Sequence, residues 1–106
     1  MEQRTIIKSL RDFAASELKE KRADRVLVGR VRLKQWLRRG RVPDFRVRTV
    51  EGTHYLVCVF RGDELRLYYM DKHGLSLGAS DFSGVEKEKV WTEVSKGTKI
   101  IFRLPS

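Results

Sequence analysis

The first twenty residues carry apolar side chains at intervals of three and four, which is the period of an amphipathic α-helix. Charged residues occupy most of the positions between them. The pattern predicts a helix with Thr5 as its N-cap and an end near Arg22, and its apolar stripe must pack against another element to be stable. The stripe consists of Ile6, Ile7, Leu10, Phe13, Ala14 and Leu18.

In the middle of the chain the pattern changes to the two-residue alternation of β-strands, interrupted by short polar segments that contain glycine. The predicted turns centre on Gly52, Gly62 and Gly74. The predicted strands cover residues 45–49, 54–60, 64–71 and, as a candidate fourth, 75–77. Because each connection is short, we expect neighbouring strands to pair in antiparallel fashion as a meander.

Near the end of the chain, Ser83 and Glu86 have the spacing of a capping box, which begins a helix. We expect this helix to run from residue 84 to about residue 95. Residues 98–104 then alternate between apolar and charged side chains and predict a last strand.

Residues 26–41 fit two interpretations. The apolar positions of residues 33–37 have helical spacing, which favours a short basic helix over about residues 30–39. Alternatively, residues 26–33 form an edge strand with a bulge at Gly29, and the cations then line a sheet.

Length and composition complete the fold prediction. A chain of 106 residues with 41% hydrophobic content suits a single domain over residues 1–106. We expect an α+β fold with an N-terminal helix, the short basic helix, a three- to five-stranded antiparallel meander and one helix before the last strand. The only cysteine, Cys58, excludes an internal disulfide, and no apolar run suggests a membrane span or a secretion signal. A cytoplasmic location is therefore expected, or a nuclear one in a eukaryote.

The positive charge is concentrated in one segment. Of the 23 Lys and Arg residues, ten lie in residues 22–48, where the only acidic residues are Asp24 and Asp44. This segment holds eight of the nine net positive charges. A concentrated, Arg-rich surface is typical of proteins that bind phosphates, so the sequence predicts a nucleic-acid partner.

The candidate contacts follow from the helix interpretation. Successive steps of four residues place three cations on one side of the predicted helix, with a fourth just beyond its end. We expect these four, Arg30, Lys34, Arg38 and Arg41, to contact phosphates. The remaining candidates, which we expect to add contacts or read bases, are Arg39, Arg46 and Arg48. DNA is expected ahead of RNA, in a regulatory role.

A short resemblance supports DNA. Residues 36–47 contain a Trp-bearing helix end, an Arg-rich turn, Pro43 and an Arg-flanked strand. This arrangement is similar to the recognition helix and wing of excisionase-like and MerR-like DNA-binding domains. Upstream, the charged run of residues 20–25 replaces the compact helix of those domains. In addition, residues 74–77 are similar to a segment of single-strand-binding transcription coactivators.

Two alternatives remain open. Small basic RelE-like toxins, which cut messenger RNA, also combine N-terminal helices with a meander. Adaptor proteins of phages or plasmids dock on acidic protein surfaces through Arg and Trp. No metal-ligand spacing, cofactor motif or paired catalytic carboxylates are present, so we expect no metal, no cofactor and no enzyme activity. The residues available for the toxin chemistry are Arg46, Arg48, Arg66, Tyr69 and His73.

Overall fold

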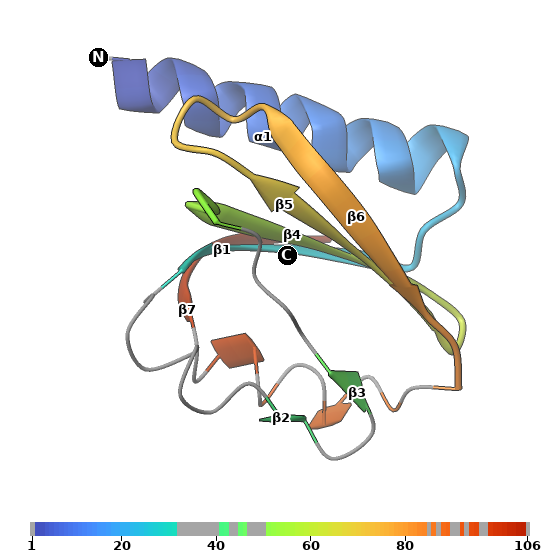
Figure 1. Cartoon of the computed structure of the whole chain (residues 1–106). Helices are drawn as coiled ribbons and strands as arrows, with labels where there is room; N and C mark the ends of the chain where they lie inside the picture. The colour runs from blue at the N-terminus through green and yellow to red at the C-terminus, as the bar shows by residue number, and fades with distance from the viewer. Residues whose placement is uncertain are drawn as a thin grey trace.

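The computed structural model describes residues 2–31, 41–42, 45–46, 51–84, 86, 88–89, 92, 94–95 and 98–105. One long helix precedes seven strands in these parts of the chain (Figure 1). The elements are α1 (Glu2–Glu20), β1 (Arg25–Val31), β2 (Arg41–Val42), β3 (Phe45–Arg46), β4 (Tyr55–Arg61), β5 (Glu64–Met70), β6 (Ser76–Phe82) and β7 (Thr98–Leu104).

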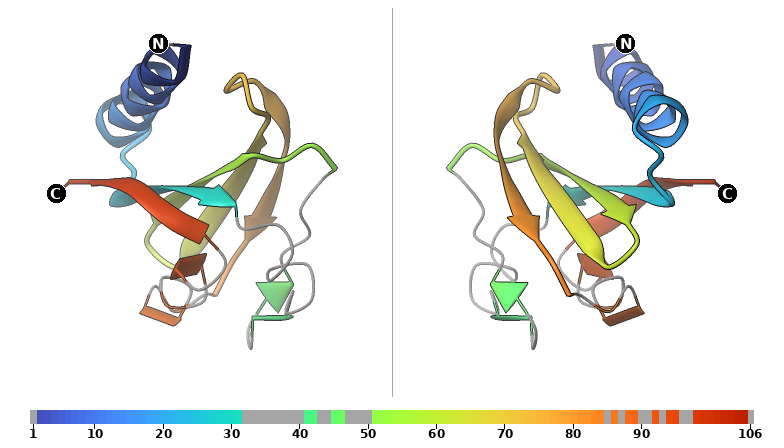
Figure 2. Two further views of the ribbon diagram at one scale, coloured as in Figure 1. Left: turned by 90° about the vertical axis from the view of Figure 1, so that its left-hand side faces the viewer. Right: turned by 90° about the vertical axis from the view of Figure 1, so that its right-hand side faces the viewer.

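Five of the strands form one antiparallel sheet with the order β6-β5-β4-β1-β7. β2 and β3 form a separate two-stranded pair. Helix α1 lies across one face of the large sheet, and the β2–β3 pair lies on the opposite side (Figures 1 and 2). The predicted α+β class is therefore confirmed, as is the antiparallel meander of β4, β5 and β6. The strand predicted over residues 45–49 is not part of it, because β3 pairs with β2 in the separate pair.

The apolar stripe of α1 covers one face of the sheet. Ile6, Leu10 and Ala14 are buried against the inward side chains of β1, β4 and β7. Thr5 is not the N-cap that the sequence suggested, because the helix extends back to Glu2. The residues before Thr5 are good helix formers, so nothing in the local sequence ends the helix there. It ends at Glu20, close to the predicted end.

A second apolar cluster fills the other face of the sheet. The residues of β4 alternate between the two clusters, and all of them except Arg61 are buried. This double burial explains why β4 is an uninterrupted apolar run, since a strand covered on both faces has no solvated side. The second cluster comprises Leu27, Leu56, Cys58, Phe60, Leu65, Leu67, Tyr69 and Val94.

The prediction of a basic helix over about residues 30–39 is wrong at the start of that range. Arg30 and Val31 belong to β1, a strand that lies between β4 and β7 and is not at an edge. Three β-branched or apolar residues, 26–28, are fully buried and pair on both sides, and this outweighs the helical spacing that follows them. Residues 32–40 lie outside the described parts of the chain.

The alternative interpretation placed a bulge at Gly29, in the strand that is now β1. The register between β1 and β7 does shift between Val28 and Gly29, but the unpaired residue is Ile101, so the bulge lies in β7 and β1 pairs with β4 without interruption. A Cβ at position 29 would lie 2.6 Å from the hydroxyl oxygen of Thr98. Glycine therefore allows β7 to approach β1 closely at this point.

The remaining elements agree with the sequence to different degrees. β7 has the predicted bounds, whereas β6 continues to Phe82, beyond the expected residues 75–77. Residues 88, 89, 92, 94 and 95 have helical backbone. The positions between them lie outside the described residues, so the extent of the predicted helix over 84–95 stays a prediction.

Candidate nucleic-acid interface

Arg30 stands beside another cation at one end of the sheet. It is exposed near the end of β1 and pairs in register with Lys99 of β7, which is also exposed. Directly opposed residues on antiparallel strands have Cβ atoms about 4.5–5.5 Å apart and share a face of the sheet. Val28, two residues before Arg30, packs under α1, so Arg30 and Lys99 both project from the α1 side.

A third cation, Lys72, lies at the same end. The amide of His54 donates to the carbonyl of Met70 at 2.7 Å, which holds the start of β4 beside the turn that carries Lys72. Partial burial lowers the pKa of His54, and the charges of Arg30 and Lys72 lower this pKa further. We call Arg30, Lys72 and Lys99 the cationic end.

The cationic end is not neutralised within the described residues. None of its three members forms an ion pair there. Like charges that face each other across a strand pair repel and destabilise the sheet. An arrangement of this kind becomes favourable when an anion is bound.

Only some of the predicted contacts fall on described residues. Arg30 is exposed, but it lies on a strand and not on the expected helix. Arg41 and Arg46 are backbone partners in the β2–β3 pair. The other candidates, Lys34, Arg38, Arg39 and Arg48, lie outside the described residues. The structure adds Lys72 and Lys99, which the sequence reasoning missed because they are distant from Arg30 along the chain.

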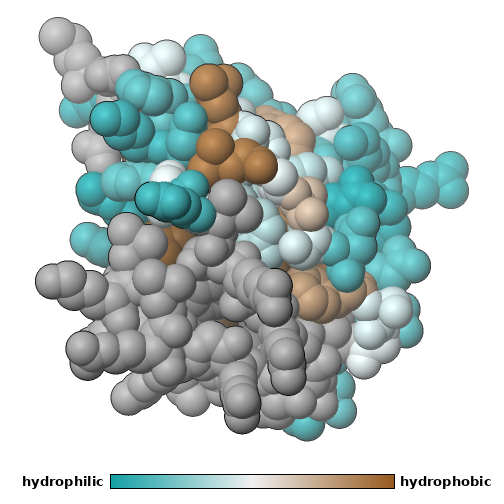
Figure 3. All heavy atoms as spheres, in the orientation of Figure 1, coloured by the Kyte–Doolittle hydropathy of each residue, from teal (hydrophilic) through white to brown (hydrophobic). Residues whose placement is uncertain are grey.

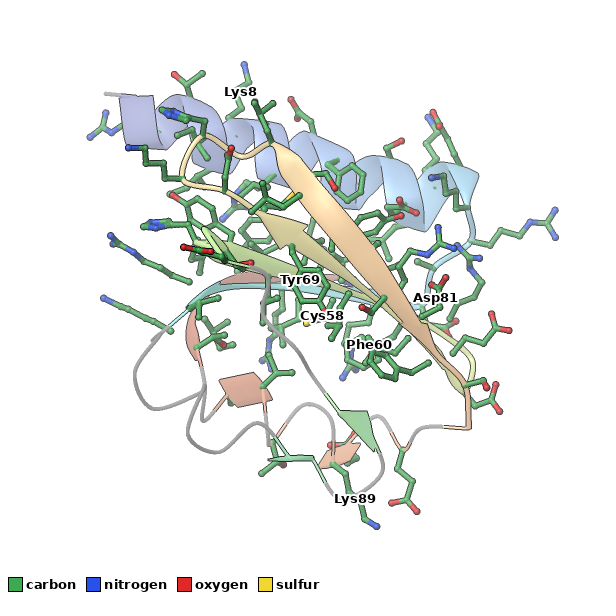
Figure 4. All side chains as sticks on the ribbon, viewed as in Figure 1. Lys8, Cys58, Phe60, Tyr69, Asp81 and Lys89 are labelled. Atoms are coloured by element: carbon green, nitrogen blue, oxygen red, sulfur yellow. The ribbon has the colours of Figure 1, made fainter. Side chains whose placement is uncertain are left out.

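Three of the residues proposed for toxin chemistry, Arg66, Tyr69 and His73, have described side chains, and they do not come together. Tyr69 is buried on the sheet face opposite α1, where its hydroxyl donates to Ser80 Oγ at 3.0 Å (Figure 4). Arg66 projects from the α1 side and is held by Asp81. His73 lies in the turn between β5 and β6. These three residues therefore share no site.

A cleft of about 310 Å³ lies at the end of the sheet away from Arg30, around the turn between β4 and β5. Arg66 Nε donates to Asp81 Oδ1 at 2.6 Å, and a second guanidinium nitrogen of Arg66 donates to Oδ2 at 3.1 Å. These bonds lower the pKa of Asp81 and raise that of Arg66. The cleft is lined by Arg61, Glu64, Arg66, Asp81, Phe82 and Ser83.

The front of the molecule also exposes apolar atoms near β6 (Figure 3). The large apolar side chains exposed among the described residues are Leu75 and Leu77, at 65% and 41%. Leu77 belongs to β6, an edge strand of the sheet, and Leu75 precedes that strand directly.

No protein family, curated protein or solved structure matches this chain. Within the described residues, no helix has the length and apolar character needed to span a membrane. The same residues contain no group of three or more His, Cys, Asp or Glu side chains placed to hold a metal ion.

Proposed function

We propose that the protein binds nucleic acid, with DNA as the first candidate, and acts as a small regulatory protein. The phosphates would contact the cationic end and the Arg-rich residues 32–48 that follow β1 directly. The observation that supports this most strongly is the cross-strand pair of Arg30 and Lys99, which has no carboxylate partner in the described residues. A phosphate placed between the two side chains removes their repulsion and accepts hydrogen bonds from both.

The charge distribution of the whole chain points the same way. Arg30 of the cationic end belongs to residues 22–48, the segment that holds eight of the nine net charges. A polyanion would be attracted both by this segment and by Lys72 and Lys99, which the fold places beside Arg30. Binding of this kind releases counterions, so its affinity falls steeply as the salt concentration rises.

The test is the salt dependence of binding to a DNA duplex. If about four to six phosphates are neutralised, log K falls against log salt with a slope of about −4 to −5. Reversing two charges with Arg30→Glu and Lys99→Glu should reduce the magnitude of the slope by about 2. Lys19→Glu is the control. Lys19 is exposed at the C-terminal end of α1, so this charge reversal should change the slope little. A slope near zero for the unmodified protein would contradict the proposal.

A second pair of variants tests the Arg-rich segment. Charge reversal at Arg38 and Arg41 should abolish binding. If both side chains project into solvent, as the sequence predicts, it should leave the melting temperature nearly unchanged, because exposed cations contribute little to folding. Loss of the fold in these variants would mean that the two side chains have structural roles.

The same measurements separate the alternatives. RNA duplexes and single strands, titrated in parallel, decide between DNA and RNA. Strand scission of an RNA substrate would support the toxin hypothesis. Retention of a protein partner after nuclease treatment, without competition by nonspecific DNA, would support the adaptor hypothesis.

A further inference from the structure

The cleft between β4, β5 and β6 contains one ion pair that is already satisfied. Arg66 directs two donors to Asp81 and a third toward the hydroxyl of Tyr68, at 3.5 Å. Its guanidinium group also lies 5.9 Å from the centre of the Tyr68 ring. Three of the five N–H donors of Arg66 therefore point to groups of the protein, and its charge is offset by that of Asp81.

A second pair of opposite charges in the cleft does not form an ion pair within the described residues. Arg61 and Glu64 are exposed and face each other in register across the turn between β4 and β5. Neither side chain forms an ion pair or a hydrogen bond within the described residues. The cleft thus presents the guanidinium donors of Arg61 next to the two carboxylate oxygens of Glu64, which are acceptors.

The charges of the cleft balance, which distinguishes it from the cationic end. Its two guanidinium groups and two carboxylates sum to zero, so the cleft has no preference for a phosphate. Phe82, which packs partly against the second apolar cluster, also lines the cleft, and the volume of about 310 Å³ is at the small end of ligand pockets. A flat, neutral ligand with both donors and acceptors at its edge satisfies these conditions.

We propose that the cleft binds an unpaired guanine base. Guanine is the base that presents two neighbouring N–H donors, at N1 and N2, and a carboxylate such as Glu64 accepts both. Its O6 and N7 acceptors match a guanidinium group such as that of Arg61. Adenine and cytosine place a ring acceptor toward the carboxylate, and thymine or uracil places a carbonyl on each side of its single donor.

This inference rests on the proposed function for the source of the base, which is a single-stranded region of the bound nucleic acid. The base must be unpaired, because Glu64 uses its Watson–Crick edge. Arg30 pairs with Tyr55 at the start of β4, and Arg61 ends the same strand six residues later. At about 3.4 Å per residue the two sites are about 20 Å apart, so each can be altered without changing the other.

The first experiment uses nucleosides, which have no phosphate and therefore no affinity for the cationic end. Deoxyguanosine, added to isotope-labelled protein, should shift the backbone amide resonances of residues 61–66 and 81–83. Deoxyadenosine and deoxycytidine should leave these resonances unchanged. Equal shifts with all three nucleosides, or shifts confined to other residues, would overturn the inference.

The second experiment compares an oligothymidine with the same strand carrying one central guanine. We expect the guanine to tighten binding by about tenfold. Glu64→Gln should remove this preference, because an amide offers one acceptor where the carboxylate offers two. Asp63→Asn is the matched control: it removes the same charge one residue away, outside the cleft, and should keep the preference.

The outcomes separate the two proposals. Arg30→Glu should weaken the binding of both oligonucleotides, with and without guanine, and should keep the preference for guanine. Salt-dependent binding of both strands without any guanine preference overturns the guanine site and leaves the proposed function standing. Deoxyguanosine shifts at the cleft without affinity for either oligonucleotide overturn the proposed function and leave the guanine site standing.

Discussion

Tyr68 of β5 donates a hydrogen bond to the buried carboxylate of Glu17 in α1, with an oxygen–oxygen distance of 3.2 Å. Glu17 is only 2% exposed, and its Oε1 also lies 3.2 Å from the ammonium group of Lys21. The Tyr68 ring packs edge-on against Phe13, with 5.0 Å between the ring centres. Burying a carboxylate without hydrogen-bond partners costs free energy, so the bond from Tyr68 to Glu17 stabilises the packing of α1 against the sheet.

Removing the Tyr68 hydroxyl should therefore destabilise the fold. We expect Tyr68→Phe to lower the free energy of unfolding by about 1–3 kcal/mol, because it leaves the Glu17 carboxylate without one of its two donors. The ring contact with Phe13 is kept. Urea denaturation of Tyr68→Phe, Glu17→Gln and the double variant measures the coupling, and the two single effects should not add. An unchanged urea midpoint in Tyr68→Phe would contradict this role of the hydroxyl.

The close approach of β1 and β7 predicts the effect of a single methyl group. In Gly29→Ala the new Cβ would lie 2.6 Å from Thr98 Oγ1 and 2.8 Å from Thr98 Cβ. Thr98 is also held by a bond from its hydroxyl to the carbonyl of Val94, at 2.7 Å. Overpacking of this kind costs about 1–3 kcal/mol, measurable by thermal or urea unfolding. The cost should fall in a Thr98→Gly background, and equal stability of Gly29→Ala and the unmodified protein would show that β7 shifts freely.

Cys58 should resist thiol reagents in the folded protein. Burial raises the pKa of its thiol from 9.0 to about 12. Since the thiolate is the reactive form, this shift alone lowers its population about a thousandfold below pH 9. A disulfide reagent at pH 8 should label the native protein far more slowly than the protein in denaturant. Labelling of the native protein at the rate of the denatured protein would show that the second apolar cluster, which contains Cys58, opens readily.

His54 should report the charge state of the cationic end. Partial burial comes first among the causes of its lowered pKa, followed by Arg30 and Lys72. The variants Arg30→Glu and Lys72→Glu should each raise this pKa, and bound nucleic acid should raise it as well, because phosphates offset the same charges. A proton NMR titration of the imidazole measures both effects. Titration of His54 at the same pH with and without DNA would contradict phosphate binding beside it.

The lowered pKa of His54 also sets the sign of its effect on stability. Between the folded pKa and the ordinary value of 6.5, the unfolded chain binds more protons than the folded chain. The contribution of His54 to the free energy of unfolding is therefore fully present above pH 6.5 and is lost as the pH falls through the folded pKa. His54→Gln should reduce the pH dependence of unfolding in this window.

The parts of the fold that depend on local pattern could be predicted from the sequence. The period of α1, the alternation of β7 and the uninterrupted apolar run of β4 each reflect which sides of the element are buried. Turns were predictable for a similar reason. Gly52, Gly62 and Gly74 all have positive φ, which glycine adopts without the steric cost that other residues meet.

Other features depend on contacts between distant segments, and no local pattern contains them. Residues 26–31 form a strand because β4 and β7 pair with it on both sides, although helical spacing follows directly. Register alone places Lys99 beside Arg30. The sequence by itself determined the class of the fold and the segment that holds the net charge, since composition and periodicity are properties of neighbouring residues. Strand pairing decided which charges meet, because it joins residues that the chain keeps far apart.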